Sequence, residues 1–264
     1  PQVWAWKKWR LRQLPALVDR MICIFDFEEA IYREAGIPAE YVGHPLVETA
    51  APRLSRDQFF SQFQLDPTLP TVALLPGSRQ IELQYILPTL LRAARQLSAA
   101  RQELQFVLAA APTLNAAWLE TRLRDRLDAR RPVRVVTDAT YDALAYSTLA
   151  VVASGTATIE AAILGCPMVV VYRVAPLTAF FARRMVDVPF FSMVNLLAGQ
   201  KVVEELIQDD FTAPRLAAAV TRLLDHPELQ SKMKEELRAV KSRLGVPGAI
   251  ERAADSILEM LQSV

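Results

Sequence analysis

Two short stretches of the chain carry residue types that bind phosphate groups. Residues 76–79 read Pro-Gly-Ser-Arg, and residues 154–156 read Ser-Gly-Thr. Glycine lets a backbone approach a ligand closely, hydroxyl groups donate hydrogen bonds, and a guanidinium can bind two phosphate oxygens at once. The first stretch therefore has the parts of a diphosphate site, although it has neither the Gly-Lys-Ser/Thr ending of a Walker loop nor the Gly-x-Gly-x-x-Gly spacing of a dinucleotide fold.

The second stretch predicts an anion site at the start of a helix. Thr156 is expected to cap that helix, whose first turn offers unpaired N–H groups and the positive end of the helix dipole. Glu160 follows one turn later, where its carboxylate could accept hydrogen bonds from ligand hydroxyls. Each stretch also has an interpretation without a ligand. The first stretch could carry a surface ion pair between Arg79 and Glu82. The second could be an ordinary strand-to-helix turn followed by a surface glutamate.

Both stretches lie between an apolar strand and an amphipathic helix, which indicates an α/β fold. Strands are expected at 71–75, 104–110, 133–136, 149–153 and in the β-branched run after Pro167, with helices between them that include 114–127 and 141–147. Near-continuous apolar strands that alternate with helices indicate a parallel sheet covered on both faces. Ligands of such sheets bind beyond the carboxyl ends of the strands, where Gly77 and Gly155 both lie.

The pattern along the chain predicts two domains. Residues 1–47 read as the last strand–helix units of one domain, and the polar, proline-bearing residues 48–56 are the best linker candidate. A second domain is expected over 52–243, followed by an amphipathic helix over 249–262. His44 at a strand end could face a cleft between the domains, although a histidine in a turn is more often a structural hydrogen-bonding group.

Two segments mix basic and apolar residues. Residues 1–12 place three tryptophans among lysines and arginines, as in a helix docked on its own domain or in a membrane-interface segment. Residues 180–184 predict a basic and apolar helix, which is followed by a loop that carries Asn195. Helices are then expected at 213–225 and 227–243.

Composition narrows the classes of function. The chain has 264 residues, 52% of them apolar, and a formal net charge of +1, so nothing global points to a nucleic-acid partner. Cys23 and Cys166 lie in apolar runs and are expected in the core rather than in a disulfide or metal site. No apolar run approaches the ~20 residues of a membrane-spanning helix. Because the first residue is Pro1 rather than methionine, we expect a piece of a longer protein.

Several motifs together resemble one enzyme family and occur in the order found there. They are LLPGSRQIEL (74–83), ASGTATIEAAILGCPMVVVYRVAPLT (153–178), SMVNLLAG (192–199), VVEELIQDD (202–210), VWAW (3–6) and FDFEEAIYREAGIPAEYVGHPLVE (25–48). Over nearly its whole length the chain resembles the lipid-A-disaccharide synthases. The resemblance implies a GT-B glycosyltransferase fold with two Rossmann-like domains, of which the donor domain is complete and the acceptor domain is truncated.

The resemblance also implies a reaction and its partners. In this family 2,3-diacylglucosamine is transferred with inversion from UDP-2,3-diacylglucosamine to 2,3-diacylglucosamine 1-phosphate (lipid X). The products are UDP and the β-1′,6-linked lipid A disaccharide precursor, formed in lipopolysaccharide biosynthesis with no cofactor and no required metal ion. The expected partners are these two lipids and the inner-membrane surface, with a homodimer left open and no nucleic acid. The expected localisation is cytoplasmic and peripheral on the inner membrane.

Site residues follow from the resemblance by position in the motifs. The residues assigned to the UDP diphosphate are Gly77, Ser78, Arg79, Ser154, Gly155 and Thr156. Glu160 is assigned to the ribose, Asn195 and Gln208 to the donor site, and the final helix is expected to cross back to the first domain. The proposed catalytic base belongs to the amino-terminal half of the family, so no catalytic residue is expected here and the chain alone would be inactive.

Departures from the family pattern leave alternatives open. Val194 and Glu204 stand where the family usually has proline, which could loosen the loop that carries Asn195. One alternative is another GT-B enzyme that uses UDP-GlcNAc, either the glycosyltransferase that makes lipid II or the UDP-GlcNAc 2-epimerase. The other is a non-catalytic remnant of an enzyme that still binds UDP.

Overall fold

The computed structural model describes residues 8–110, 133–175 and 189–262, together with Trp4, Leu119, Leu123 and Thr178. Leu119 and Leu123 are buried, but the rest of the predicted helix at 114–127 lies outside the described residues. The predicted basic and apolar helix around 180–184 lies outside them as well, and so does Trp6 of the opening segment.

A six-stranded sheet forms the centre of the larger unit. In order across the sheet it consists of β5 (Arg134–Thr137), β4 (Gln105–Ala110), β3 (Thr71–Leu75), β6 (Leu149–Ala153), β7 (Met168–Tyr172) and β8 (Glu204–Ile207). Every neighbouring pair is parallel. The central strands are buried along their whole length, as expected when helices cover both faces. The structure therefore confirms the predicted parallel sheet and adds β8, which the sequence pattern did not show.

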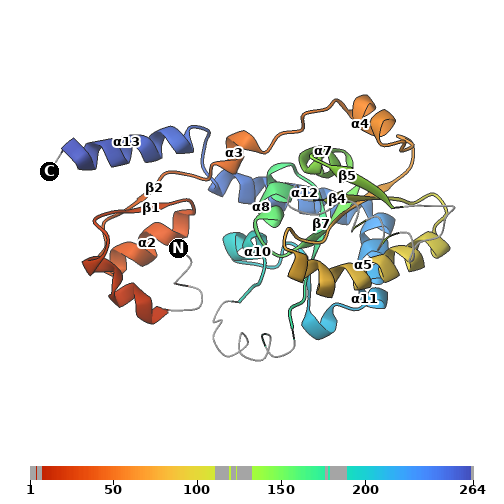
Figure 1. The fold of residues 1–264 in the computed structure, drawn as a ribbon, viewed down its shortest axis with the longest axis horizontal. Helices are drawn as coiled ribbons and strands as arrows, with labels where there is room; N and C mark the ends of the chain where they lie inside the picture. The colour runs from red at the N-terminus through yellow and green to blue at the C-terminus, as the bar shows by residue number, and fades with distance from the viewer. Residues whose placement is uncertain are drawn as a thin grey trace.

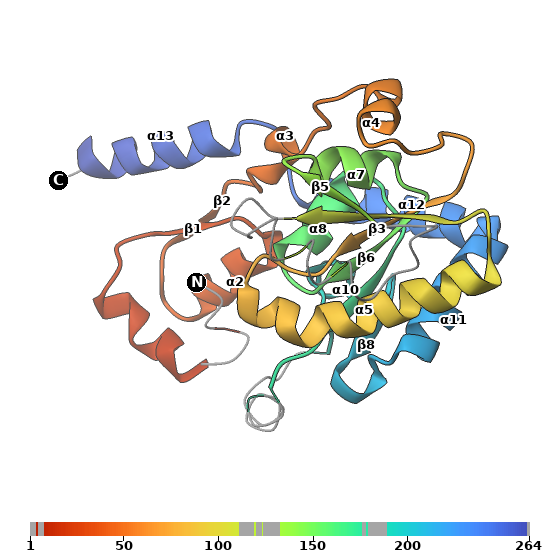
Figure 2. The same ribbon diagram turned by 45° about the vertical axis from the view of Figure 1, so that its right-hand side comes forward.

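Helices cover both faces of this sheet (Figures 1 and 2). On one face α5 (Gln80–Ala100) packs against α11 (Ala213–Asp225). The helices on the other face pack around α8 (Thr156–Ile163), and they are α7 (Thr140–Tyr146), α10 (Met193–Ala198) and α12 (Pro227–Arg243). The structure confirms the predicted bounds of the helices at 213–225 and 227–243. Each could be predicted because its buried residues recur at helical spacing.

The amino-terminal residues form a smaller unit with its own core. It contains η1 (Lys8–Arg12), η2 (Leu14–Ala16), β1 (Met21–Cys23), α2 (Asp26–Glu34) and β2 (Ala39–Tyr41), with β1 and β2 parallel. β1 ends at Cys23, and α2 begins at Asp26 after two intervening residues. The buried indole N–H of Trp4 donates to the Glu28 carboxylate at 2.9 Å, so this tryptophan is held on the smaller unit, whereas Trp9 is exposed.

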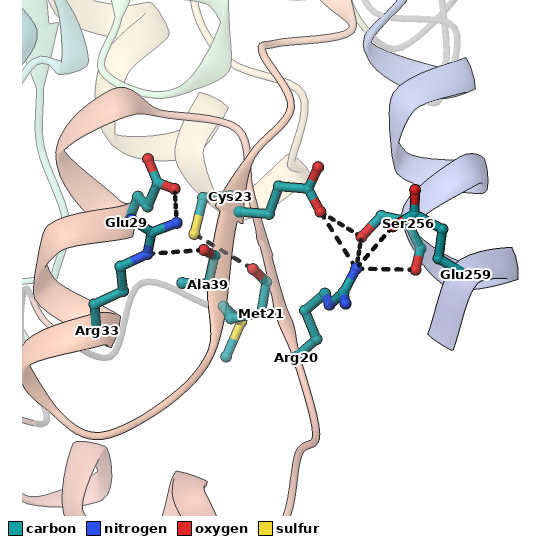
Figure 3. Close-up of polar contacts among 9 residues, drawn as sticks. Arg20, Met21, Cys23, Glu29, Arg33, Ala39, Ser256 and Glu259 are labelled. Atoms are coloured by element: carbon teal, nitrogen blue, oxygen red, sulfur yellow. Dashed lines mark hydrogen bonds and ion pairs between the residues drawn. The ribbon is translucent and has the colours of Figure 1, made fainter. Parts of the chain in front are cut away.

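The last helix, α13 (Ala249–Gln262), lies beside β1 and β2 (Figure 1). Figure 3 shows Arg20 pointing at this helix, where its guanidinium donates to the Ser256 hydroxyl at 2.9 Å and lies 3.7 Å from the Glu259 carboxylate. Arg252 of α13 donates to the Val42 carbonyl at 2.9 Å. The opposite side of α13 leaves four apolar side chains exposed, namely Ile250, Ile257, Leu258 and Leu261. Within the described ranges, no helix has the length and hydropathy needed to cross a membrane.

The predicted linker is fixed to the larger unit. Residues 48–56 run from the end of α3 (Leu46–Thr49) to the start of α4 (Arg56–Gln62). Between them the backbone N–H groups of Arg53 and Leu54 donate to one oxygen of the buried Asp142 carboxylate, at 2.8 and 2.7 Å. A proline-bearing stretch without periodicity gives no sign of such an anchor, because the acceptor lies 89 residues away along the chain.

The prediction of a loop around Asn195 is wrong, since residues 193–198 form the helix α10. The helix is capped by the Ser192 hydroxyl and ends at Gly199, whose φ is +68°. Val194 is buried inside its first turn, where a helix N–H has no intrahelical partner, so valine in place of proline costs no hydrogen bond. Glu204 begins the edge strand β8, another position that accepts proline or a residue with an N–H group. Neither replacement therefore removes a hydrogen bond from this segment.

Candidate functional site

The two glycine-containing stretches meet at the point where the strand order of the sheet reverses. The chain runs outward from β3 through β4 to β5 and then returns to place β6 on the other side of β3. Leu75 and Val152 are register partners, so the residues that follow β3 and β6 leave the sheet side by side. Open parallel sheets bind ligands in the crevice at this kind of reversal. We call residues 76–79 the Gly77 turn and residues 154–156 the Gly155 turn.

Both turns line one cavity of about 550 Å³. Its lining also includes residues from the carboxyl ends of β4 and β7 and from the start of α7. The full lining is Arg53, Leu75, Gly77, Ser78, Arg79, Glu82, Ala109, Asp138, Thr140, Tyr141, Asp142, Ala153, Ser154, Gly155, Thr156, Ala157, Glu160 and Tyr172. The structure thus brings together all seven residues expected at the diphosphate and the ribose.

The Gly77 turn leads directly into α5. Gly77 has a φ of +105°, a backbone conformation that residues with a side chain rarely adopt. Arg79 precedes the first helical residue with no side-chain cap, so the first turn of α5 begins beside the cavity with no side chain accepting from its N–H groups. The Arg79 side chain is 78% exposed, and its guanidinium lies 3.5 Å from the Glu82 carboxylate. The ion pair predicted as the alternative is therefore present, but it lies at the cavity and is weak enough to be exchanged for a ligand.

The Gly155 turn leads into α8 and differs in one detail from the expectation. Gly155, rather than Thr156, is the cap residue of α8, and Thr156 is the first helical residue. The helix has no side-chain cap, because the Thr158 hydroxyl donates to the Gly155 carbonyl at 2.7 Å and no side chain accepts from the first N–H groups. The Ser154 hydroxyl donates to the Phe191 carbonyl at 2.9 Å. This turn therefore offers backbone N–H groups, and its serine anchors the turn.

Glu160 lies one turn into α8 and receives a hydrogen bond of 3.2 Å from the Tyr141 hydroxyl. Burial raises the pKa of the Glu160 carboxyl above its usual range, and the bond from Tyr141 acts in the opposite direction. A half-buried carboxylate that keeps unused lone pairs is suited to accept hydrogen bonds from ligand hydroxyl groups. Tyr141 was not found from the sequence, although its place just after β5 put it at the same edge of the sheet.

Asn195 lies outside this cavity and is completely buried. Its amide oxygen accepts from the backbone N–H groups of Val202 and Val203 at 2.8 and 2.9 Å. Its amide nitrogen donates to the Val203 carbonyl at 2.9 Å and to the Glu205 carboxylate at 2.8 Å. All of its hydrogen-bonding capacity is used inside the protein, so the expected contact with the donor is replaced by a structural role beside the site.

Gln208 and His44 are not brought to this cavity either. Gln208 follows β8, one strand beyond the cavity, with a φ of +54°, and its carbonyl accepts from the Arg173 guanidinium at 2.9 Å. His44 is buried between β2 and α3, and its backbone N–H donates to the Leu244 carbonyl at 2.8 Å. Its Nδ1 accepts from the Leu46 N–H, and burial lowers the pKa of the imidazole. These contacts match the structural interpretation of His44.

The described residues contain no group of three or more His, Cys, Asp or Glu side chains that could hold a metal ion. Cys23 and Cys166 are both free and buried, and burial raises the pKa of each thiol to about 12. Both thiols are therefore core groups at neutral pH, as expected from the apolar runs around them.

Comparison with solved structures shows the class of fold. The chain is similar to UDP-GlcNAc 2-epimerase from Neisseria meningitidis bound to UDP-GlcNAc, with a TM-score of 0.64, 13% identity, and coverage of 92% of this chain and 62% of that one. It is also similar to Anabaena HepE in complex with UDP-glucose, with a TM-score of 0.56, 14% identity, and coverage of 98% and 68%. At these identities the likeness shows the fold alone, which is the α/β arrangement of GT-B proteins.

Comparison with sequences shows the family. The family model described as lipid-A-disaccharide synthetase matches residues 1–257. The chain is 43% identical to the lipid-A-disaccharide synthase of Syntrophus aciditrophicus (strain SB) and 42% identical to that of Solibacter usitatus (strain Ellin6076). Each match covers 99% of this chain and 68% of the relative's length. The chain belongs to the lipid-A-disaccharide synthetase family, a family of glycosyltransferases.

Proposed function

We propose that the cavity is the nucleotide-sugar donor site of a lipid-A-disaccharide synthase. The observation that carries the proposal is the meeting of the Gly77 turn, the Gly155 turn and Glu160 in one cavity at the reversal of the strand order. The donor would be UDP-2,3-diacylglucosamine and the acceptor lipid X, as the family membership suggests. The products would be UDP and the β-1′,6-linked disaccharide 1-phosphate.

The geometry of the cavity supports a role for its two turns in stabilising UDP, the leaving group. When the sugar leaves, negative charge grows on the diphosphate of UDP. Arg79 would exchange Glu82 for the diphosphate when the donor binds, and the backbone N–H groups at the starts of α5 and α8, which both line the cavity, would be fixed donors beside it. Preorganised donors of this kind stabilise developing charge without reorganisation. Glu160 would hold the ribose hydroxyls and so fix the nucleotide relative to both turns.

The acceptor side and the catalytic base are proposed to lie outside this chain, which spans 68% of the length of the curated relatives quoted above. We propose a peripheral position on the cytoplasmic face of the inner membrane, which is supported by the acylated substrates of the family.

Calorimetric titration of the chain with UDP tests the donor site. Arg79→Ala removes a charge-assisted contact of ~1.5–3 kcal/mol, so UDP affinity should fall roughly ten- to a hundredfold. Arg222→Ala is the matched control, because Arg222 is also an exposed arginine paired with a glutamate, at 2.6 Å from Glu204, and lies outside the cavity. Saturable binding that only Arg79→Ala weakens supports the proposal. A folded chain that binds no UDP contradicts it.

Transfer itself is tested in a full-length protein that contains this chain. Formation of the disaccharide from UDP-2,3-diacylglucosamine and lipid X is expected. UDP binding without any transfer by such a protein would instead favour the non-catalytic UDP-binding module.

A further inference from the structure

Glu205 is a carboxylate in the edge strand β8 that holds the segment before α10. Its two oxygens accept hydrogen bonds from the backbone N–H of Phe191 at 3.0 Å and from that of Ser192 at 2.9 Å. One of them also accepts from the Asn195 amide at 2.8 Å. Three donors on one carboxylate fix the backbone of residues 191–192 relative to the sheet.

The segment held by Glu205 reaches the Gly155 turn. The Phe191 carbonyl belongs to the same short stretch of backbone and accepts the hydrogen bond of 2.9 Å from the Ser154 hydroxyl. A serine hydroxyl has one proton, and in this arrangement that proton is used on Phe191. The contacts therefore run without a gap from Glu205 through residues 191–192 to Ser154.

The neighbouring Glu204 has no part in these contacts. Successive side chains of a strand point to opposite faces, and the Glu204 carboxylate pairs with the exposed Arg222 on α11 at 2.6 Å. The Glu205 carboxylate therefore accepts hydrogen bonds from the segment before α10, whereas the Glu204 carboxylate forms an ion pair on the other face.

We propose that Glu205 is a positioning residue for the diphosphate half of the donor site. By fixing the Phe191 carbonyl it anchors Ser154, which keeps the N–H groups of the Gly155 turn directed at the cavity. Ser154 acts in this arrangement as the anchor of the turn rather than as a donor to the phosphate. This assignment rests on the proposed function, because it needs a diphosphate in the cavity.

The assignment makes a prediction that a purely structural role does not make. Uridine carries the ribose that Glu160 would hold but has no phosphate. A variant that loosens only the Gly155 turn should therefore lose affinity for UDP and keep its affinity for uridine. A variant that damages the fold should lose affinity for both.

The test is calorimetric titration of Glu205→Gln and Glu204→Gln with UDP and with uridine. A glutamine at 205 keeps the length of the side chain but turns an NH₂ group towards donors, so at least one of the three bonds is lost. We expect UDP affinity to fall about tenfold, which is the effect of losing one charge-assisted hydrogen bond, and uridine affinity to change less than twofold. Glu204→Gln should change neither. Equal losses for both ligands in Glu205→Gln would overturn the assignment.

A second measurement needs no ligand and separates this assignment from the proposed function. Amide hydrogen exchange should become faster at residues 191–192 and at residues 154–158 in Glu205→Gln, and at neither place in Glu204→Gln. Ser154→Ala breaks the same link from its other end and should speed exchange at 154–158, which covers the case in which Glu205→Gln does not fold. Unchanged exchange at 154–158 in both variants overturns the assignment. Failure of the unsubstituted chain to bind either ligand is a failure of the proposed donor site, and exchange then decides whether Glu205 holds the turn.

Discussion

The Glu82 carboxylate packs directly against Gly77, so closely that a Cβ atom added to Gly77 would lie 2.7 Å from Glu82 Oε2. Glu82 is in the first turn of α5, where a negative charge is stabilised by the helix dipole. In the absence of ligand, the carboxylate and Arg79 therefore neutralise each other at the edge of the Gly77 turn. The glycine is needed here both for its backbone conformation and for space.

Gly77→Ala should affect both stability and binding. Its φ of +105° is unfavourable for alanine, which costs about 1–2 kcal/mol, and the new methyl group would push Glu82 out of place. We expect UDP affinity to fall at least about tenfold, measured by calorimetry. Gly36→Ala is the control, since Gly36 has a φ of +78° with nothing within 4 Å of the added Cβ. It should lose similar stability in urea unfolding and keep its UDP affinity; an equal loss of affinity in both variants would count against the Gly77 turn as a ligand site.

Glu82→Gln should strengthen UDP binding. The diphosphate must replace the Glu82 carboxylate as the partner of Arg79, and removing the negative charge removes that competition. Exposed ion pairs of this kind are worth ~0.2–1 kcal/mol, so the expected gain in affinity is up to about fivefold. The gain should shrink as salt is added, because the competing charges are screened. Weaker binding in Glu82→Gln would show instead that the carboxylate supports the bound state.

Sequence reasoning located the elements whose pattern is long or strongly apolar. β3 and β6 are uninterrupted apolar runs, and α11 and α12 have apolar stripes over several turns, so their bounds were predicted closely. β8 and α10 were missed for the same physical reason. β8 has only four residues and begins with two glutamates, and α10 has only six, too few to show a helical period.

The candidate site was predictable only in the parts that are local in sequence. Both turns were found because glycine and hydroxyl residues directly follow apolar strands. Tyr141 could not be paired with Glu160 from the sequence, since the two residues are 19 positions apart and meet only once β5 and β6 lie in one sheet. Asn195 was placed at the ligand from its position in a family motif, whereas its contacts with Val202, Val203 and Glu205 depend on the undetected strand and the turn before it.

Asn195→Ala tests whether this side chain supports the fold or the ligand. The change leaves the buried N–H groups of Val202 and Val203 without an acceptor, and each such group costs ~1–3 kcal/mol. We expect the free energy of unfolding to fall by roughly 2–4 kcal/mol in urea titration. Once corrected for the folded fraction, UDP affinity should fall much less than in Arg79→Ala. Full stability with a large loss of UDP affinity would show instead that the Asn195 side chain contacts the ligand.

Glu160→Gln should make the protein more stable at neutral pH while weakening the binding of uridine. Burial raises the pKa of Glu160 above its usual value of 4.5, so the folded state holds this proton more tightly than the unfolded state does. The contribution of Glu160 to stability is therefore greatest at low pH and falls as the pH rises through its folded pKa. The variant has no such loss, so its free energy of unfolding should exceed that of the unsubstituted chain near pH 7 and match it below about pH 4.

Uridine binding should depend on pH in the opposite sense, because the ionised carboxylate is the better acceptor for ribose hydroxyls. Affinity is expected to fall on acidification with a midpoint above 4.5, the usual pKa of a glutamate. Tyr141→Phe removes a bond that favours the ionised form, so the midpoint should move to higher pH. Tyr146→Phe is the matched control on the same helix, since its hydroxyl donates to the Leu54 carbonyl at 2.5 Å and touches no carboxylate. A midpoint that Tyr141→Phe leaves in place would mean that Glu160 does not control the pH dependence of binding.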